Sequence, residues 1–442
     1  MKDILRVLEQ SQIDLSEIDR AKAVVAQPEP PAGSSAEVLN AYHYRRSVAF
    51  QKLGKLDEAV VSARLTAVDF KHPNPQFELR DIVNMGVIEN FLGNQPQVIK
   101  AFTTAKAGAE KYKMGGMILL TNRLLVGAYS NTGNFEAAKA SMLDADAQMT
   151  MMRRSPRLGE FVNMWESQVE SARGIYLSSQ GLWVESERAY RKALHLLNIA
   201  FKNVQDNAKR VDELADGPRV LTDGTNTTRG YLTQISSRSL NLSEVLLQQR
   251  KLVDAEFYAR EALKLSLDNF GRNSSDVGRA LATLSRIISE QGRFDEALLL
   301  AKASMAAHAE SGITDESRTM AVARKFYATA LVAKGQFKEA DEAFSQMMAS
   351  VQKDPELVKT FNRNDLDWVM AMQKIGKGDE AFAMSEQMHQ SVLKQAGKNS
   401  PRTAMVGAFH AGSLQLQGKA AEAYALYKEV TPILVDEARN DA

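Results

Sequence analysis

A short phrase recurs nine times along this 442-residue chain, and that recurrence limits the possible folds more than any other feature. In its clearest form the phrase is a glycine followed five residues later by an alanine, as in GKLDEAV at 54, GRFDEAL at 292 and GKGDEAF at 376. Further copies begin at positions 93, 133, 181, 250, 335 and 418. All but one of the successive spacings fall between 39 and 48 residues. The chain is therefore expected to repeat one supersecondary unit.

A second series of small residues keeps a constant distance from the first. The alanine position is occupied in order by Ala59, Val98, Ala138, Ser186, Ala255, Ala297, Ala340, Ala381 and Ala423. Twelve residues earlier stand Ser47, Gly86, Val126, Gly174, Ser243, Ser285, Ala328, Val369 and Ala411. Small side chains at facing positions let two antiparallel helices approach to the short end of the usual range of about 8–10 Å.

The residues between the two series suit a helix turn. Glycine can end a first helix, the A helix, in a left-handed cap, and the Asp and Glu after it suit the first turn of a second, the B helix. We therefore predict an all-α fold, an α-α superhelix of nine helical hairpins with a repeat length near 42 residues. Residues 1–35 are expected to form a leading helix and a Pro/Gly/Ser linker, 36–202 units one to four, 203–230 an insertion with an exposed loop, and 231–442 units five to nine.

The repeated phrases resemble the tetratricopeptide repeat (TPR). In that repeat the B helix carries an alanine after the turn glycine, and an aromatic residue or a second alanine four residues later. That position is filled in seven of the nine units, by Ala63, Phe102, Tyr190, Ala259, Ala301, Phe344 and Tyr427, whereas Met142 and Ser385 depart from the pattern. The usual TPR unit has about 34 residues, so the longer spacing predicts longer helices, as in the variant resembling kinesin light chain. The resemblance covers about residues 36–435 and implies a protein-interaction scaffold whose concave wall, lined by A helices, binds a peptide segment or a partner domain.

The residues that most enzyme and cofactor sites require are missing or scattered. The chain has no cysteine, its six histidines lie in separate stretches, and no phosphate-binding glycine loop is present. The 55 Lys and Arg nearly balance the 54 Asp and Glu, which argues against a nucleic-acid partner. No stretch is apolar enough for membrane insertion. We predict a chain that is not an enzyme and has no cofactor and no metal site. It is cytoplasmic by default, or exported or periplasmic if an N-terminal signal was removed.

The A helices allow a prediction of the residues that face the concave groove. They should stand at −6, −3, +1, +4 and +5 from the small residue of each A helix, and basic residues outnumber acidic ones there. The predicted partner-binding residues are Arg80, Arg123, Arg279, Arg286, Lys325, Arg363, Lys374, Asn90 and Asn131. Arginine and lysine at these positions favour a partner that carries carboxylates, and side-chain amides can pair with an extended backbone. The alternative is that these long side chains only solvate the inner wall.

A narrower resemblance concerns the phrases at 181–194, 248–263 and 290–305. They are similar to the arrays of bacterial TPR–CHAT proteins, in which repeats precede a caspase-like peptidase with a His/Cys pair. Because this chain has no cysteine, the resemblance implies a regulatory or sensor region without its peptidase. A signalling-peptide receptor is a further alternative. Pro432, followed by an apolar Ile-Leu-Val triplet, is expected to interrupt the last helix, and no capping helix follows. That ending fits either a removed next domain or self-association through the C-terminal end.

Overall fold

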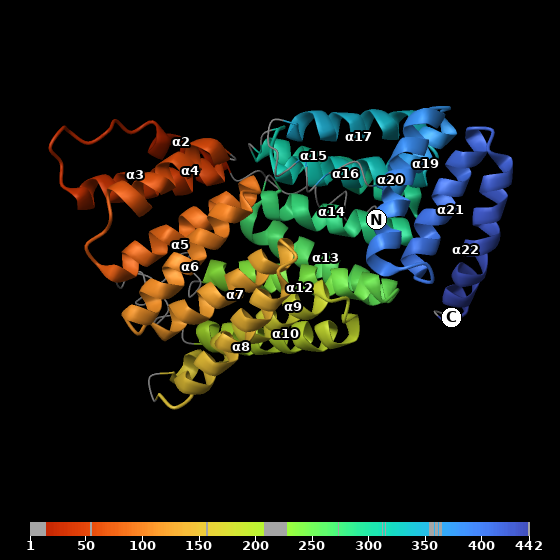
Figure 1. Cartoon of the computed structure of the whole chain (residues 1–442). Helices are drawn as coiled ribbons and strands as arrows, with labels where there is room; N and C mark the ends of the chain where they lie inside the picture. Colours follow the sequence, from red (N-terminus) through yellow and green to blue (C-terminus); the bar gives the residue numbers. More distant parts are fainter. Residues whose placement is uncertain are drawn as a thin grey trace. The chain divides into compact units, whose positions relative to one another are not determined.

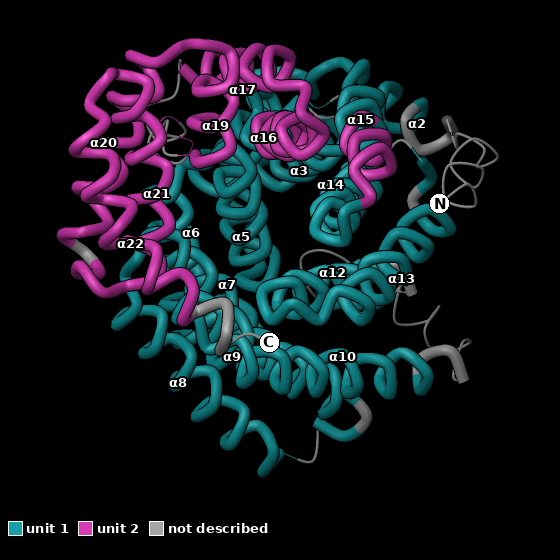
Figure 2. The backbone as a smooth tube through the Cα atoms, turned by 90° about the vertical axis from the view of Figure 1, so that its right-hand side faces the viewer, with its two compact units in different colours: residues 1–292, 303–320 teal, residues 293–302, 321–442 magenta. Residues whose placement is uncertain are grey.

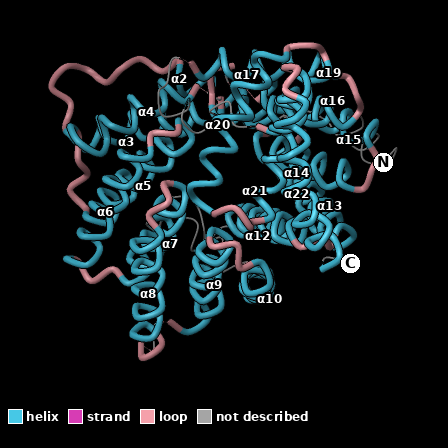
Figure 3. The backbone as a smooth tube through the Cα atoms, turned by 45° about the vertical axis from the view of Figure 1, so that its right-hand side comes forward, coloured by secondary structure: helices cyan, strands magenta, loops and turns pink. Residues whose placement is uncertain are grey.

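Helices make up most of the part of the chain that the computed structural model describes (Figure 1). That part comprises residues 15–53, 55–155, 158–206, 228–272, 274–311, 313, 315–352, 358, 361 and 365–440. It contains 19 α-helices and no strand (Figure 3). The predicted all-α fold class is confirmed.

After a leading helix α2 (Leu15–Val25), the helices alternate as nine A and B pairs. In order these are α3 (Ala36–Lys52) with α4 (Leu56–Arg64), α5 (Pro75–Leu92) with α6 (Gln95–Lys111), α7 (Gly115–Asn131) with α8 (Phe135–Met152), α9 (Val162–Ser179) with α10 (Trp183–Asp206), α12 (Thr228–Gln248) with α13 (Leu252–Phe270), α14 (Ser275–Glu290) with α15 (Phe294–Glu310), α16 (Arg318–Ala333) with α17 (Phe337–Val351), α19 (Leu366–Lys374) with α20 (Gly378–Ala396), and α21 (Pro401–Leu416) with α22 (Ala420–Asn440). A π-helical turn, Leu65–Asp69, continues α4, and a 3₁₀ turn, Gly159–Phe161, precedes α9.

The helices divide into two compact units (Figure 2). Unit 1 comprises residues 1–292 and 303–320, and unit 2 comprises residues 293–302 and 321–442. Within unit 1 each A helix from α3 to α12 packs on the B helix that follows it, and α9 also packs on the preceding A helix α7. Within unit 2, α19 packs on α20 and α21 on α22.

The predicted ladders of small residues form the contact between paired helices. All nine residues of each series are buried, and eight of the nine at the alanine position have no exposed surface. The closest approaches occur at glycine: a Cβ on Gly86 would lie 2.6 Å from the Phe102 ring, and one on Gly174 would lie 2.9 Å from the Tyr190 ring. The Ser186 hydroxyl donates to the Gly174 carbonyl at 2.9 Å. Short side chains therefore let the two backbones approach.

The turns behave as the repeated glycine predicts. Seven described A helices are followed by a glycine with φ between 72° and 85°, the left-handed conformation that glycine adopts without steric cost. In the unit that lacks this glycine, Arg250 takes the same conformation with φ 59°. Gly54 lies outside the described residues.

Ser400 is the N-cap residue of α21, and Pro401 stands in its first turn, where proline costs no helical hydrogen bond. The expected break at Pro432 is wrong, because α22 continues through it to Asn440. Most of the 203–230 insertion lies outside the described residues; its first four residues extend α10 and its last three begin α12. The boundaries proposed for the four sequence segments stay predictions.

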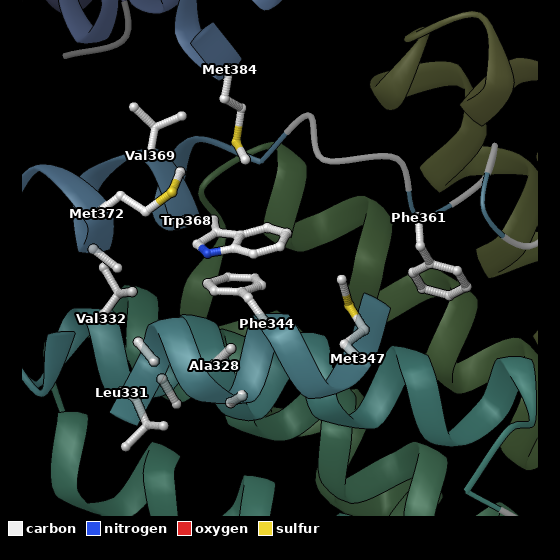
Figure 4. Packing of buried hydrophobic residues seen from close by; sticks show 14 of the residues in the cluster. Ala328, Leu331, Val332, Phe344, Met347, Phe361, Trp368, Val369, Met372 and Met384 are labelled. Atoms are coloured by element: carbon white, nitrogen blue, oxygen red, sulfur yellow. The ribbon is translucent and has the colours of Figure 1, made fainter. Parts of the chain in front are cut away.

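Unit 2 is organised around stacked aromatic rings (Figure 4). The ring centroids of Phe344 and Trp368 lie 5.3 Å apart with 12° between the planes, and methionines such as Met347 and Met384 pack around them. The Trp368 indole donates to Asp341 at 2.8 Å, so its one polar atom is satisfied inside the core. The C-terminal methionines thus fill core space between irregular helices.

Among the described residues, the helices are too short or too polar for one to traverse a lipid bilayer.

Candidate functional site: a polar hollow on the A helices of unit 1

Four successive A helices of unit 1 line one shared hollow with a volume of about 410 Å³. The hollow lies at the C-terminal ends of α7, α9 and α12 and in the last turns of α14. Its polar lining includes Asn131, Ser178, Ser179, Glu244, Gln248 and Arg286. We call this surface the A-helix hollow.

Part of the lining stands at positions of the register predicted for the groove. Relative to the small residue of each A helix, Glu244 and Arg286 stand at +1, Ser178 at +4, and Asn131 and Gln248 at +5. Residues three and four apart share a helix face, so these positions on consecutive helices line one wall. The positions −6 and −3 do not contribute to this hollow.

The floor of the hollow is built by the same packing that builds the hairpin α9–α10. The Tyr190 ring fits against Gly174, and burial raises the pKa of the Tyr190 hydroxyl, which is hydrogen-bonded to Ser178. The Ser178 hydroxyl donates to the Ile175 carbonyl at 2.9 Å. The phenol therefore stays protonated at neutral pH and serves as a neutral wall rather than as an acid or base.

The rim carries both charges and amides. Glu244, Gln248 and Asn131 are exposed, and Arg286 is half-buried. The hollow thus contains one cation and one anion, and the ends of its helices present carbonyl groups, which favour donors and cations. Its local charge does not select an acidic segment.

Two of the nine predicted binding residues, Asn131 and Arg286, meet in the hollow. Arg279 stands two helical turns before Arg286 on α14, is exposed, and forms a loose ion pair of 3.8 Å with Asp276. Arg123 is half-buried on α7, away from the hollow lining.

Arg80 and Asn90, on α5, are engaged within the repeat. The Arg80 guanidinium lies 3.7 Å from the centre of the Tyr44 ring and bonds Asp81 at 2.6 Å, and only 14% of its side chain is exposed. The Asn90 amide oxygen accepts from Gln95 at 3.0 Å. These residues stabilise the packing and offer little surface to a partner.

The remaining predicted residues belong to unit 2 or lie outside the described part. Lys325 pairs with Asp365 at 2.8 Å, and Lys374 is exposed at the end of α19. Arg363 lies outside the described residues. The partner-binding roles predicted for Lys325, Arg363 and Lys374 stay predictions.

Sequence reasoning missed the aromatic part of the lining. Phe135 and Trp183 each stand two residues after the turn glycine and reach the hollow from the start of a B helix. The pattern Gly-x-aromatic, visible as GNF and GLW, would have indicated them. Asn241, at −2, lies outside the predicted register and also lines the hollow.

No group of three or more metal-binding side chains comes together among the described residues. His308 and His410 are buried, and burial lowers the pKa of His308 to about 4. His410 is a core histidine: it has 8% exposed surface, and its Nδ1 lies 3.1 Å from the Ser385 hydroxyl.

Neither the protein-family models nor the curated proteins contain a match to this chain. Solved structures of helical repeat proteins are similar to it. Aspartyl phosphate phosphatase F from Bacillus subtilis is 11% identical, with a TM-score of 0.47 over 92% of this chain and 96% of that one. A Rap protein in complex with competence and sporulation factor is 13% identical, with a TM-score of 0.44 over 95% of this chain and 96% of that one.

The TPR-like repeats of a kinesin light chain from Podosopora anserina are 20% identical, with a TM-score of 0.36 over 47% of this chain and 98% of that one. Identities this low concern the fold alone, so nothing about binding or activity passes from these proteins to this chain. The TPR-type helical repeat is established here by the ladders, the turns and the pairing of the helices.

Proposed function

We propose that this chain is a non-catalytic interaction protein that binds an extended segment of a partner in the A-helix hollow of unit 1. The observation that carries the proposal is the convergence of polar side chains from four successive A helices on one hollow. An extended backbone exposes alternating N–H and C=O groups, and the amides of Asn131, Asn241 and Gln248 can both donate to and accept from them.

Two charged residues give the hollow a means of selecting sequence. Arg286 offers a planar donor fork to a carboxylate, and Glu244 can accept from a lysine or arginine of the bound segment. The aromatic rings of Phe135 and Trp183 supply apolar contact area beside them. A segment with side chains of both charges fits this arrangement better than a uniformly acidic one.

The Ser130 hydroxyl supports binding by hydrogen bonds. It lines the hollow, is buried, and has no hydrogen-bond partner among the described residues. Buried hydroxyls in folded proteins normally have a partner, and a bound backbone would provide one.

The test is selection of binders from a displayed library of random 12-residue peptides, followed by fluorescence anisotropy on the enriched sequences. Arg286→Gln should weaken peptides with Asp or Glu about tenfold, or about 1.4 kcal/mol. Glu244→Gln should weaken those with Lys or Arg by a similar factor, and Asn131→Ala with Gln248→Ala should weaken both classes. Arg188→Gln, on the exposed face of α10, is the matched control.

Equal affinities for wild type and all hollow variants would rule out this site. Truncation of the best peptide separates two kinds of partner. A free signalling peptide should keep its affinity at five to seven residues, about the length of a short extended segment, whereas a segment of a larger protein should lose affinity on each shortening. The resemblance to TPR–CHAT arrays stays a prediction from the sequence.

A further inference from the structure

A second and larger cavity, of about 750 Å³, lies between α7, α8 and the start of α9. It is distinct from the A-helix hollow, because it opens at the N-terminal half of α7 whereas the hollow lies at the C-terminal end of that helix. Its size is within the range of about 300–1,000 Å³ that is usual for small-molecule sites. We call it the α7–α8 cavity.

Most of the α7–α8 cavity wall is apolar. The wall includes Ile118, Met151, Met152, Leu158, Phe161 and Trp165. Methionine and aromatic side chains adapt to varied apolar shapes, which is a property of binding surfaces.

Two glycines at the start of α7 keep this wall in its present form. A Cβ on Gly116 would lie 2.6 Å from the Trp165 ring, and one on Gly115 would lie 3.1 Å from the Met152 sulfur. The indole and the thioether therefore pack directly against the helix backbone beside the cavity.

The uncharged polar side chains of the lining are Asn122, Gln148 and Ser155. Asn122 differs from the other two because it is fully buried. Asn122 has no exposed surface, and neither its Nδ2 nor its Oδ1 has a hydrogen-bond partner among the described residues. A buried side-chain amide without partners is costly and uncommon. The neighbouring Thr121, equally buried, bonds the Met117 carbonyl at 2.8 Å, so partners are found for other polar groups of this turn.

The charged lining residues are confined to the rim. Glu110, Lys113 and Asp144 are all exposed. An ionised group placed beside Asn122 would lose its hydration without gaining a counter-charge, which is strongly unfavourable. A neutral group that both donates and accepts meets the needs of Asn122.

We propose that the α7–α8 cavity binds a small, uncharged, apolar molecule that carries an amide. The ligand N–H donates to Asn122 Oδ1, its carbonyl accepts from Asn122 Nδ2, and its apolar part lies against Trp165 and the methionines. This site is separate from the proposed peptide-binding function and stands without it.

The experiment is calorimetric titration of the full chain with three matched probes. Phenylacetamide donates and accepts, methyl phenylacetate only accepts, and phenylacetate is charged. We expect phenylacetamide to bind at least tenfold more tightly than either of the others. Asn122→Leu, of similar volume, should remove that preference while its free energy of unfolding equals or exceeds that of wild type, because no hydrogen bond within the protein is lost.

A second pair of variants keeps the test decisive if Asn122→Leu does not fold. Ala147→Trp places a large ring on an exposed lining position of α8 and should abolish phenylacetamide binding. Ala140→Trp, two turns earlier on α8 and outside the lining, should leave it unchanged.

The proposal is overturned by equal affinities for the three probes, by undiminished phenylacetamide binding to Asn122→Leu, or by binding to Ala147→Trp as strong as to Ala140→Trp. A blocked tetrapeptide, acetyl-Gly-Phe-Asn-Gly-amide, serves as a fourth probe. If it binds and phenylacetamide does not, the cavity takes a protein segment and the small-molecule assignment is wrong.

Discussion

At the scale of single residues, the polar contacts between helices explain where charge is tolerated. Glu187 on α10 is nearly buried, yet it accepts from Arg191 at 2.8 Å, Lys251 at 2.7 Å and Gln249 at 2.9 Å. Burial by itself would raise the pKa of this carboxyl, but the hydrogen bonds from Lys251, Arg191 and Gln249 outweigh it and lower the pKa to about 2. The contact joins α10 to the turn that precedes α13.

This carboxylate makes stability depend on pH. The unfolded chain takes up a proton at a higher pH than the folded chain, so the contribution of Glu187 is complete above its unfolded pKa of 4.5 and is lost as the pH falls toward 2. Glu187→Ala should lower the free energy of unfolding by about 2 kcal/mol at pH 7, since charge-assisted hydrogen bonds are lost. Urea titrations at pH values between 5.5 and 3 should show a smaller loss of stability in the variant than in wild type.

Glu185→Ala, on the exposed side of the same helix, is the control. It should change neither the free energy of unfolding at pH 7 nor the loss of stability between pH 5.5 and 3 by more than about 0.5 kcal/mol. An identical pH profile for Glu187→Ala and wild type would contradict the assignment.

At the scale of helices and turns, one backbone conformation is imposed on different residues. The turn after α14 uses Gly292 with φ 76°, whereas the turn after α12 uses Arg250 with φ 59°. The left-handed conformation costs a residue with a side chain about 1–2 kcal/mol. The pair α12–α13, whose turn has no glycine, therefore keeps the same turn conformation at an energetic cost.

Exchanging these two residues tests that cost. Arg250→Gly should raise the free energy of unfolding by about 1 kcal/mol, because the exposed ion pair with Glu290 contributes little. Gly292→Arg should lower it by about the same amount, and urea denaturation measures both. A loss of stability in Arg250→Gly would show that the side chain matters more than the backbone conformation.

At the scale of the whole molecule, the chain comprises two compact units, and helical repeats contact mainly their neighbours. A change in the core of one unit is then expected to act locally. Trp368→Phe in unit 2 removes the hydrogen bond to Asp341 and part of the ring stacked on Phe344.

Hydrogen exchange measured by mass spectrometry should show whether the effect of the substitution stays within unit 2. Trp368→Phe should speed amide exchange in α17, α19 and α20, by the factor of about ten that 1.4 kcal/mol implies, with no change in α5 to α10. Trp183→Phe, a variant in unit 1, should speed amide exchange among α5 to α10 and leave α17, α19 and α20 unchanged. Uniform acceleration in both variants would show that the two units unfold as one.

The sequence by itself determined the repeat, its pairing and its turns. The reason is physical: the contact between paired helices depends on small residues at constant spacing, and a left-handed turn depends on glycine, so both leave local marks in the chain. The lining positions +1, +4 and +5 of the A-helix hollow also follow from helical periodicity, whereas Asn241 at −2 does not.

Only the tertiary structure decided which of those positions act together. Arg80 and Arg286 are both predicted groove residues, yet Asp81 and Tyr44 hold Arg80 within the packing while Arg286 lines a hollow. Nor does the sequence indicate that the Asn122 side chain is buried without a hydrogen-bond partner among the described residues. Burial and hydrogen-bond partners depend on residues from other helices, and that information is absent from the periodicity of a single helix.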